Sequence, residues 1–199
     1  MPAADVEIKA EFTYAGVTIN GVRWSEFNVD EPGKFTAKVT DYGMFYQWGR
    51  KTAWLSTGSN PVSSPSGTSW TAVPDGTDSD VWAPANDPCP TGWRLPTKAD
   101  QDKLFVAANV TNAWTADYNG SGIGGRTFTD NTSGNSIFFP ATGFRSYDAG
   151  ALGYQGDGGL YWSATSNSAK NTWYLNFRDN FVGQSYSSRS AGFPVRCVR

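Results

Sequence analysis

The residues that this chain lacks limit the chemistry that it can do. The 199 residues include no histidine and only two cysteines, Cys89 and Cys197. Catalysis by Ser-His-Asp or Cys-His groups needs a histidine, and structural zinc sites need four Cys or His ligands. We therefore expect no metal site and no cofactor. The two cysteines could instead form one disulfide, which would close a long loop and indicate an oxidising, extracellular setting.

Carboxyl groups offer a second possible chemistry, because most glycosidases use a pair of them. Asp148 and Asp157 lie close in the sequence and could converge. A catalytic acid also needs a desolvated pocket, whereas the glycines around these two residues indicate a loop. No closely spaced set of Asp, Asn and Glu predicts a calcium site. We interpret both aspartates as loop residues in contact with solvent.

A glycine-rich segment, GSGIGGR at residues 120–126, has the composition of a phosphate-binding loop. Such a loop follows a strand and opens a helix. Here ADYN precedes the segment and TFTDNTSG follows it, and neither sequence has the required pattern. We interpret the segment as a flexible surface loop.

Charge and hydropathy argue against two classes of partner. The formal net charge is −2, whereas a general nucleic-acid binder needs a basic stripe. No run of about 18 apolar residues is present, so we expect no membrane insertion. Residues 1–10 lack the charged-then-apolar pattern of a signal peptide. Either a leader has been removed, or the protein leaves the cell by another route, for instance inside a virion.

The elements that position any site are expected to include one helix, at about residues 97–108. Thr97 can cap this helix by bonding a first-turn amide, and Asp100 favours the positive end of the helix dipole. Helical spacing would turn the apolar side chains of Leu104, Phe105 and Ala108 inward.

Short strands account for most of the remaining expected structure. The Asn20-Gly21 pair predicts a hairpin turn before a strand over residues 22–30. Residues 136–146 contain a buried strand, and three further strands follow at 160–166, 172–178 and 193–199. Residues 55–80 form a Ser/Gly/Pro-rich loop, and residues 112–136 are again rich in Gly, Asn and Thr. The aromatic residues expected in the core near residue 50 are Phe45, Tyr46, Trp48 and Trp54.

The C-terminal segment TWYLNFR combines a core pattern with a polar one. Successive side chains of a strand point to opposite faces. One face carries Trp173, Leu175 and Phe177, which we expect in the core, and the other carries Thr172, Tyr174, Asn176 and Arg178. The following residues are again rich in Tyr, Ser and Asn, which is the composition of antibody-like binding loops. An ordinary polar strand face is the alternative interpretation.

Several stretches taken together resemble a known family. They are VTINGVRWSEFNV, YGMFYQWG, WAPANDPCPTGWRLPT, FPATGFR, GLYWSATS, WYLNF and GFPVRCVR. In this order they resemble the Fibrobacter succinogenes major paralogous domain family, from about residue 17 to the end. The resemblance implies an α+β, C-type-lectin-like fold, related to the formylglycine-generating-enzyme type, and a disulfide between Cys89 and Cys197. Residues 1–16 would be an N-terminal extension or a strand from a neighbouring segment.

The tail is also similar to the variable proteins of diversity-generating retroelements, in which adenine-directed copying rewrites codons near the gene's 3′ end. The resemblance implies a variable region at about residues 145–190 set in a fixed frame. That frame would be Tyr161, Trp162, Ser163, Leu175, Phe177, Arg189, Gly192, Phe193, Val195, Arg196 and Cys197.

We therefore expect a non-enzymatic module that binds a protein or glycan ligand on a host or neighbouring cell, displayed on a bacterial surface or a phage tail. The main anchors would be Tyr174, Arg178, Phe181 and Tyr186. The remaining ligand-binding residues would be Tyr147, Asp148, Gln155, Asp157, Ser166, Ser168, Asn176, Asp179, Asn180, Ser185, Ser187 and Ser188.

Two alternatives stay open at this point. One is an invariant structural domain of a surface lipoprotein or adhesin. The other is an enzyme of the formylglycine-generating type, which would need reactive cysteines. In terms of stability, we expect Tyr174→Ser to stay within about 0.5 kcal/mol of the parent because Tyr174 is placed on the surface. Leu175→Ala should cost about 2–5 kcal/mol.

Overall fold

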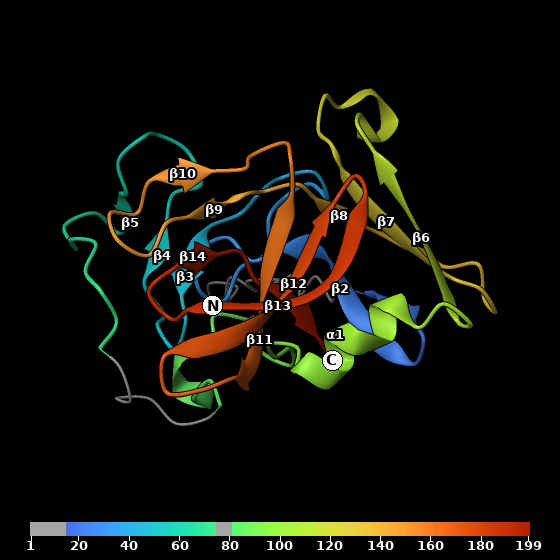
Figure 1. Cartoon of the computed structure of the whole chain (residues 1–199), viewed down its shortest axis with the longest axis horizontal. Coiled ribbons are helices and arrows are strands. Elements are labelled where there is room, and N and C mark those ends of the chain that lie inside the picture. The colour runs from blue at the N-terminus through green and yellow to red at the C-terminus, as the bar shows by residue number, and fades with distance from the viewer. Residues whose placement is uncertain (1–14, 75–80) are drawn as a thin grey trace, which may run out of the picture.

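The computed structural model describes residues 15–74 and 81–199. Within these ranges the chain forms short antiparallel strands in small sheets, one short α-helix and many loops (Figure 1). The strands are β1 (Val17–Ile19), β2 (Val22–Asn28), β3 (Phe45–Gln47), β4 (Ala53–Trp54), β5 (Ser63–Ser64), β6 (Val110–Thr115), β7 (Gly125–Asp130), β8 (Ser136–Pro140), β9 (Phe144–Arg145), β10 (Leu152–Gly153), β11 (Gly159–Ser166), β12 (Asn171–Arg178), β13 (Phe181–Ser188), β14 (Gly192–Phe193) and β15 (Arg196–Val198). The helices are η1 (Pro84–Asn86), α1 (Lys98–Asp102), η2 (Lys103–Phe105) and η3 (Tyr118–Gly120), where η marks a 3-10 turn.

The sheets combine strands that lie far apart in the sequence. Their orders are β1-β2-β15, β10-β9-β14-β3-β4-β5, β11-β12-β13 and β6-β7-β8. The hairpin between β1 and β2 turns at Asn20 and Gly21, whose φ angles are 46° and 76°. Two positive φ angles match the twist of a two-residue hairpin, and Asn-Gly adopts them readily. This turn confirms the sequence prediction.

Helix α1 is shorter than the predicted 97–108. Thr97 does cap it: its hydroxyl accepts from the Asp100 amide, and the Asp100 carboxylate accepts from the Thr97 amide. The α-helix ends at Asp102, and a single 3-10 turn carries the chain to residue 105. Leu104 is buried as expected and Phe105 is half-buried, but Ala108 is exposed because the helix ends before it.

The segment at 112–136 contains strands that its composition did not indicate. Strand β6 and strand β7 pair along six residues and form a sheet with β8. Within the expected surface loop 120–126, Gly125 and Arg126 belong to β7 and are buried. A Cβ on Gly125 would lie 2.2 Å from the Phe139 carbonyl oxygen, so glycine is required there. Strand β8 is buried over most of its length, as predicted.

Two hydrophobic clusters form the core on either side of the β11–β13 sheet, which occupies the centre of Figure 1. The first surrounds Trp48, Trp162 and Phe193. The second surrounds Phe128 and Phe139. The four aromatic residues predicted for the core near residue 50 are all buried: Phe45, Tyr46, Trp48 and Trp54.

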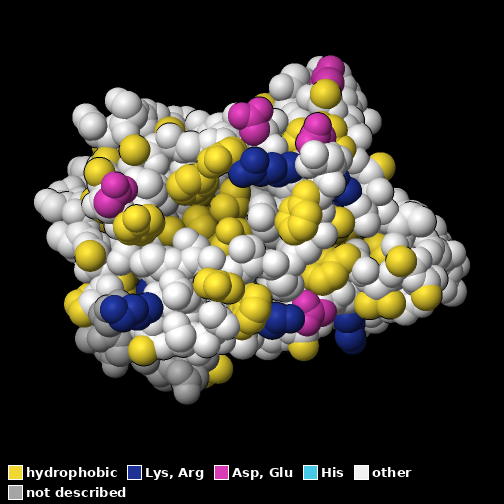
Figure 2. All heavy atoms as spheres, in the orientation of Figure 1, with side chains coloured by type: hydrophobic (Ala, Val, Ile, Leu, Met, Phe, Trp, Pro, Cys, Tyr) yellow, Lys and Arg dark blue, Asp and Glu magenta, His cyan; other side chains and the backbone are white. Residues whose placement is uncertain are grey.

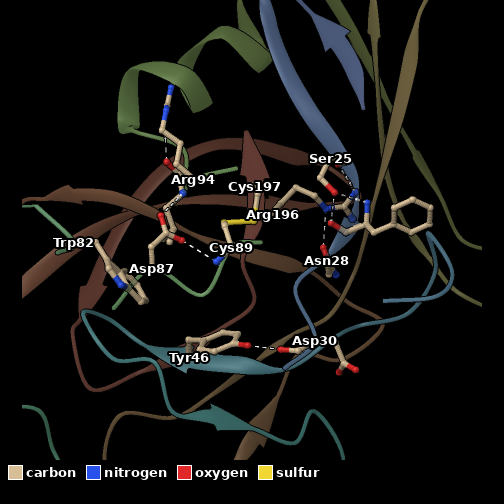
Figure 3. The surroundings of a disulfide bond; sticks show 12 residues. Ser25, Asn28, Asp30, Tyr46, Trp82, Asp87, Cys89, Arg94, Arg196 and Cys197 are labelled. Carbon is tan, nitrogen blue, oxygen red and sulfur yellow. Dashed lines mark hydrogen bonds between the residues drawn. A yellow bond between two sulfur atoms is a disulfide. The ribbon is translucent and has the colours of Figure 1, made fainter. Parts of the chain in front are cut away.

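The C-terminal strand is held by a covalent bond and by a buried arginine (Figure 3). Cys89 and Cys197 form the expected disulfide, with their Cα atoms 6.0 Å apart. Next to it, the fully buried Arg196 side chain donates to the Asn28 side-chain oxygen at 2.7 Å and to the Ser25 carbonyl at 3.2 Å. The Arg196 contacts fix β15 against β2, and the disulfide joins β15 to the segment around Cys89.

In the ranges that the structure describes, no helix has the length and hydropathy needed to span a bilayer.

Candidate functional site

Strand β12 presents both of its faces to core residues. It lies between β11 and β13, and the register places Trp162, Tyr174 and Ser185 side by side on one face. Tyr174 is 9% exposed and packs against Trp162 and Phe193 with ring centroids 6.2 Å and 4.8 Å away. The expectation that Tyr174 is a surface residue is therefore wrong. The side chains of β12 alternate between two faces as predicted. The face that the sequence analysis assigned to solvent, however, packs partly on the first hydrophobic cluster, around Trp48, Trp162 and Phe193.

The opposite face of β12 carries Leu175 and Phe177, which are fully buried as predicted. Trp173 shares this face but is only half-buried. Its ring forms a T-shaped contact with the Tyr186 ring, with centroids 5.7 Å apart, and the Lys98 ammonium of α1 lies 5.1 Å from the Trp173 ring centroid. Trp173 is thus a peripheral residue and not part of the core, because its ring contacts Tyr186 and Lys98 and belongs to neither hydrophobic cluster.

Four separate parts of the C-terminal half line one hollow of about 280 Å³, which we call the tyrosine hollow: the 144–154 segment, β11, β12 and the 187–193 segment. Figure 2 shows hydrophobic side chains gathered in a depression between the β9–β10 hairpin and the β11–β13 sheet, with a basic side chain along one edge. The lining residues are Phe144, Tyr147, Tyr154, Leu160, Tyr174, Asn176, Arg178, Ser187, Ala191 and Phe193. Five of them were predicted as ligand-binding: Tyr147, Tyr174, Asn176, Arg178 and Ser187.

Tyr154 is the most exposed of the five lining residues that the sequence analysis did not predict as ligand-binding. It stacks on Phe144 at 5.5 Å and leaves 44% of its surface exposed. Its φ of 59° is uncommon for a bulky residue, and such outliers concentrate at functional sites. The available signal was a large aromatic residue within a glycine-rich loop, between Gly153 and Gly156.

Arg178 joins the tyrosine hollow to a second one. Its guanidinium carbon lies 4.2 Å from the centroid of the Tyr154 ring, in a cation–π contact. Arg178 and Tyr154 also line a hollow of about 460 Å³, which we call the acidic hollow. The residues that line it are Trp114, Ala116, Tyr154, Gly156, Asp157, Arg178 and Asp179. The predicted residues Asp157, Arg178 and Asp179 therefore meet here, and Trp114 of β6 is a further residue that the sequence analysis missed.

A buried arginine positions the turn between β12 and β13. Arg126 of β7 donates to the carbonyl oxygens of Arg178 and Asp179, the latter at 2.8 Å. Burial lowers the pKa of Arg126, and the nearby Asp179 carboxylate acts in the opposite direction. Because both acceptors are backbone atoms, the Arg178 side chain remains available at the rim of the two hollows.

Arg145, whose side chain is fully buried, anchors the 145–158 loop by hydrogen bonds. It donates to the carbonyl oxygens of Leu55, Gly150, Thr57 and Gly58 at 2.6–3.2 Å. The loss of solvent around the guanidinium lowers the pKa of Arg145. These bonds join the 145–158 loop to the 55–58 segment.

Two of the predicted loop residues stabilise the loop itself. A hydrogen bond from Ser146, followed by one from the Ala149 amide, lowers the pKa of Asp148. The Gln155 side-chain amide donates to the Ser56 carbonyl at 2.6 Å. Neither Asp148 nor Gln155 lines the two hollows.

A family comparison bears on the whole chain. The model of the Fibrobacter succinogenes major domain matches residues 12–199. The chain belongs to this family. The match begins a few residues before residue 17, where the sequence resemblance was expected to start. Searches among curated proteins and among solved structures gave no match.

The frame expected from the resemblance coincides with buried positions of this Fibrobacter succinogenes major domain. Its members are at most 1% exposed where a value is given, and Gly192 is also buried. A Cβ on Gly192 would lie 2.8 Å from the Trp70 ring. The remaining predicted ligand-binding residues lie outside both hollows, at the end of β11, in the β11–β12 and β12–β13 turns or on β13: Ser166, Ser168, Asn180, Phe181, Ser185, Tyr186 and Ser188.

The described part of this domain contains no set of side chains that could ligate a metal ion. No group of three or more Cys, Asp or Glu side chains in these ranges is arranged to hold an ion. A larger hollow of about 740 Å³ is lined by Asp30, Asp41 and other residues of the 36–44, 55–57 and 121–123 segments, and it includes none of the predicted ligand-binding residues. The Asp41 carboxylate there accepts from the Lys38 amide at 3.0 Å. The tyrosine hollow is therefore the better candidate for recognition.

Proposed function

We propose that this domain is a non-enzymatic ligand-binding module with a C-type-lectin-like α+β frame, and that the tyrosine hollow and its rim form the ligand surface. One observation carries the proposal: residues of the 144–154 segment, of β12 and of the 187–193 segment line the same hollow. Such a concave, mostly apolar site with a few convergent polar groups is the usual form of a ligand site.

The type of side chain at the rim also supports binding. Tyr147 is 60% exposed and Tyr154 44% exposed, although both are large rings. Tyrosine supplies contact area at a small cost in conformational entropy, and its hydroxyl adds a hydrogen bond. The chain has no histidine and both cysteines are in a disulfide, so neither a histidine base nor a cysteine nucleophile is available at the hollow.

The split between a buried frame and an accessible rim supports a variable protein of the diversity-generating-retroelement type. Substitution at the rim leaves the frame residues in place, so one scaffold can present many surfaces. The disulfide favours display in an oxidising setting, on a bacterial surface or a virion. The partner would be a protein or glycan on another cell.

A genomic test of this type of function is direct. The DNA downstream of the gene should hold a near-copy of the codons for residues 145–199 that differs at adenines. The differing positions should include Tyr147, Asn176 and Arg178. A unique downstream sequence would contradict diversification but leave ligand binding open.

A binding test addresses the hollow itself. The whole chain would be applied to immobilised glycans and to fixed bacterial and host cells, beside the triple variant Tyr147→Ser, Asn176→Ser, Arg178→Ser. We expect the parent to bind a subset of these targets and the triple variant to lose at least about tenfold in affinity. Val106→Ser is the matched control, because Val106 is exposed but lines neither hollow. Equal binding by parent and triple variant would contradict the assignment.

A further inference from the structure

The only charge on the residues that line the tyrosine hollow is positive. Arg178 is the only charged residue among those that line it, all of which lie in the described ranges. Arg178 is exposed, and no ion pair in these ranges involves its guanidinium. Asp157 and Asp179 line the acidic hollow, which shares Arg178 and Tyr154 with the tyrosine hollow, but neither aspartate lines the tyrosine hollow itself. An anionic group that enters the tyrosine hollow would therefore meet a positive charge and no carboxylate.

The guanidinium is positioned before any ligand arrives. It stacks on Tyr154 at 4.2 Å, and Tyr154 is itself stacked on Phe144. A stacked guanidinium keeps its edge free, and that edge matches the two oxygens of a carboxylate. Little side-chain entropy is then lost when the carboxylate binds.

The rest of the wall fits a hydroxylated ring better than a purely apolar one. Tyrosine rings offer flat apolar faces, while Asn176, Ser187 and the tyrosine hydroxyls offer donors and acceptors. A site with such groups rejects a ligand that leaves them unpaired. The volume of about 280 Å³ lies just below the roughly 300–1,000 Å³ of drug-sized sites, so the hollow suits one ring-sized group.

We infer that the tyrosine hollow is a subsite for one acidic sugar residue, a pyranose with a ring carboxylate such as a hexuronic acid. This inference rests on the proposed function, because it names the ligand class of the same surface. The sugar ring packs on the tyrosine faces, Arg178 binds the carboxylate, and Asn176 and Ser187 bind ring hydroxyls.

The test is an NMR titration of the isotope-labelled whole chain with methyl glucuronide and methyl galacturonide, beside the neutral methyl glucoside and methyl galactoside. At least one uronide should shift the amide signals of Tyr154 and Asn176, and its neutral counterpart should bind at least about tenfold more weakly. Benzoate, a flat carboxylate without hydroxyls, should also bind more weakly. Equal binding of acid and neutral sugars, stronger binding of benzoate, or no shift with either uronide would overturn the inference.

Two variants separate charge from shape. Arg178→Gln should remove the preference for the uronide over the neutral sugar, while the affinity for the neutral sugar should stay unchanged. Asn176→Asp should weaken the binding of the uronide and not that of the neutral sugar, because it places a carboxylate in the wall of the tyrosine hollow. Unchanged thermal unfolding would show that both variants fold. Retained acid preference in Arg178→Gln would contradict the inference.

The outcomes also distinguish this inference from the function on which it rests. The uronides could fail to bind while the parent chain still binds cells through Tyr147, Asn176 and Arg178. In that case the ligand class is wrong, but the proposed binding surface is supported. If the rim variants change no binding to any target, the proposed function fails as well.

Discussion

Strands β12 and β13 pair along their entire length, yet their side chains are buried to very different extents. Strand β12 has four buried residues: Thr172, Tyr174, Leu175 and Phe177. Strand β13, which is described in full, has none. The cause is position, because β12 is the central strand of its sheet and β13 is the edge. The difference shows that a central strand can supply both buried frame residues and residues that line the tyrosine hollow. The side chains of the edge strand can be substituted with less effect on the core.

The largest effect should come from removing a β12 ring. Phe177 is fully buried and contacts Phe128, Phe139 and Tyr161. Phe177→Ala should lower the free energy of unfolding by about 3–5 kcal/mol, because it leaves a cavity in the second cluster. Its cross-strand neighbour Val182 is half-buried, and Val182→Ala should cost about 1 kcal/mol. Denaturant unfolding measures both, and equal losses would contradict the comparison.

The next effect tests the corrected position of Tyr174. Tyr174→Ser should cost about 2–4 kcal/mol, since the ring packs on Trp162 and Phe193. Ser185→Ala, directly across on β13, should stay within about 0.5 kcal/mol. Thermal and urea unfolding of the two variants would check this difference. A stable Tyr174→Ser protein would restore the surface interpretation of this residue.

A smaller effect concerns the turn that joins the two strands. Arg126→Met leaves the carbonyl oxygens of Arg178 and Asp179 without their donor, which should cost about 1–3 kcal/mol. The control is Arg178→Met in the same turn, which loses only an exposed contact with Tyr154 and should cost less than about 1 kcal/mol. Hydrogen exchange of the turn amides should rise in Arg126→Met and not in the control. The reverse order would show that the arginine does not hold the turn.

The smallest effect is expected on β13 itself. Tyr186 is 56% exposed and meets Trp173 only at its edge. Tyr186→Ser should therefore change the free energy of unfolding by no more than about 0.5 kcal/mol. A loss above 2 kcal/mol in denaturant unfolding would mean that β13 belongs to the frame.

Local signals in the sequence predicted the elements that depend on local chemistry. The Asn20-Gly21 turn and the Thr97 cap are set by neighbours a few residues away, and both are correct. The period of two in β12 is also correct. A single strand cannot reveal whether its polar face meets solvent or a second core, and this is why Tyr174 was misplaced. Strand β7 was missed because its polar residues are paired and covered only by tertiary packing.

The candidate site follows the same rule. Asn176, Arg178 and Ser187 could be named from residue type, since aromatic and polar side chains in a loop-rich tail favour recognition. Tyr147 was named through the resemblance to the variable proteins. Tyr154 could not be named in either way, because its left-handed backbone and its stack on Phe144 arise from the fold around it. Pairing of distant cysteines was predicted through the family resemblance and is confirmed.

The contacts of Arg145 have a consequence for evolution. All of its acceptors in the 55–58 and 148–151 segments are main-chain carbonyl oxygens. Every amino acid provides the same carbonyl, so the side chains of Leu55 and Thr57 can be exchanged without removing a single acceptor. The contacts of Arg145 are thus insulated from exchange of these two side chains, so both positions can change while their backbone stays in place.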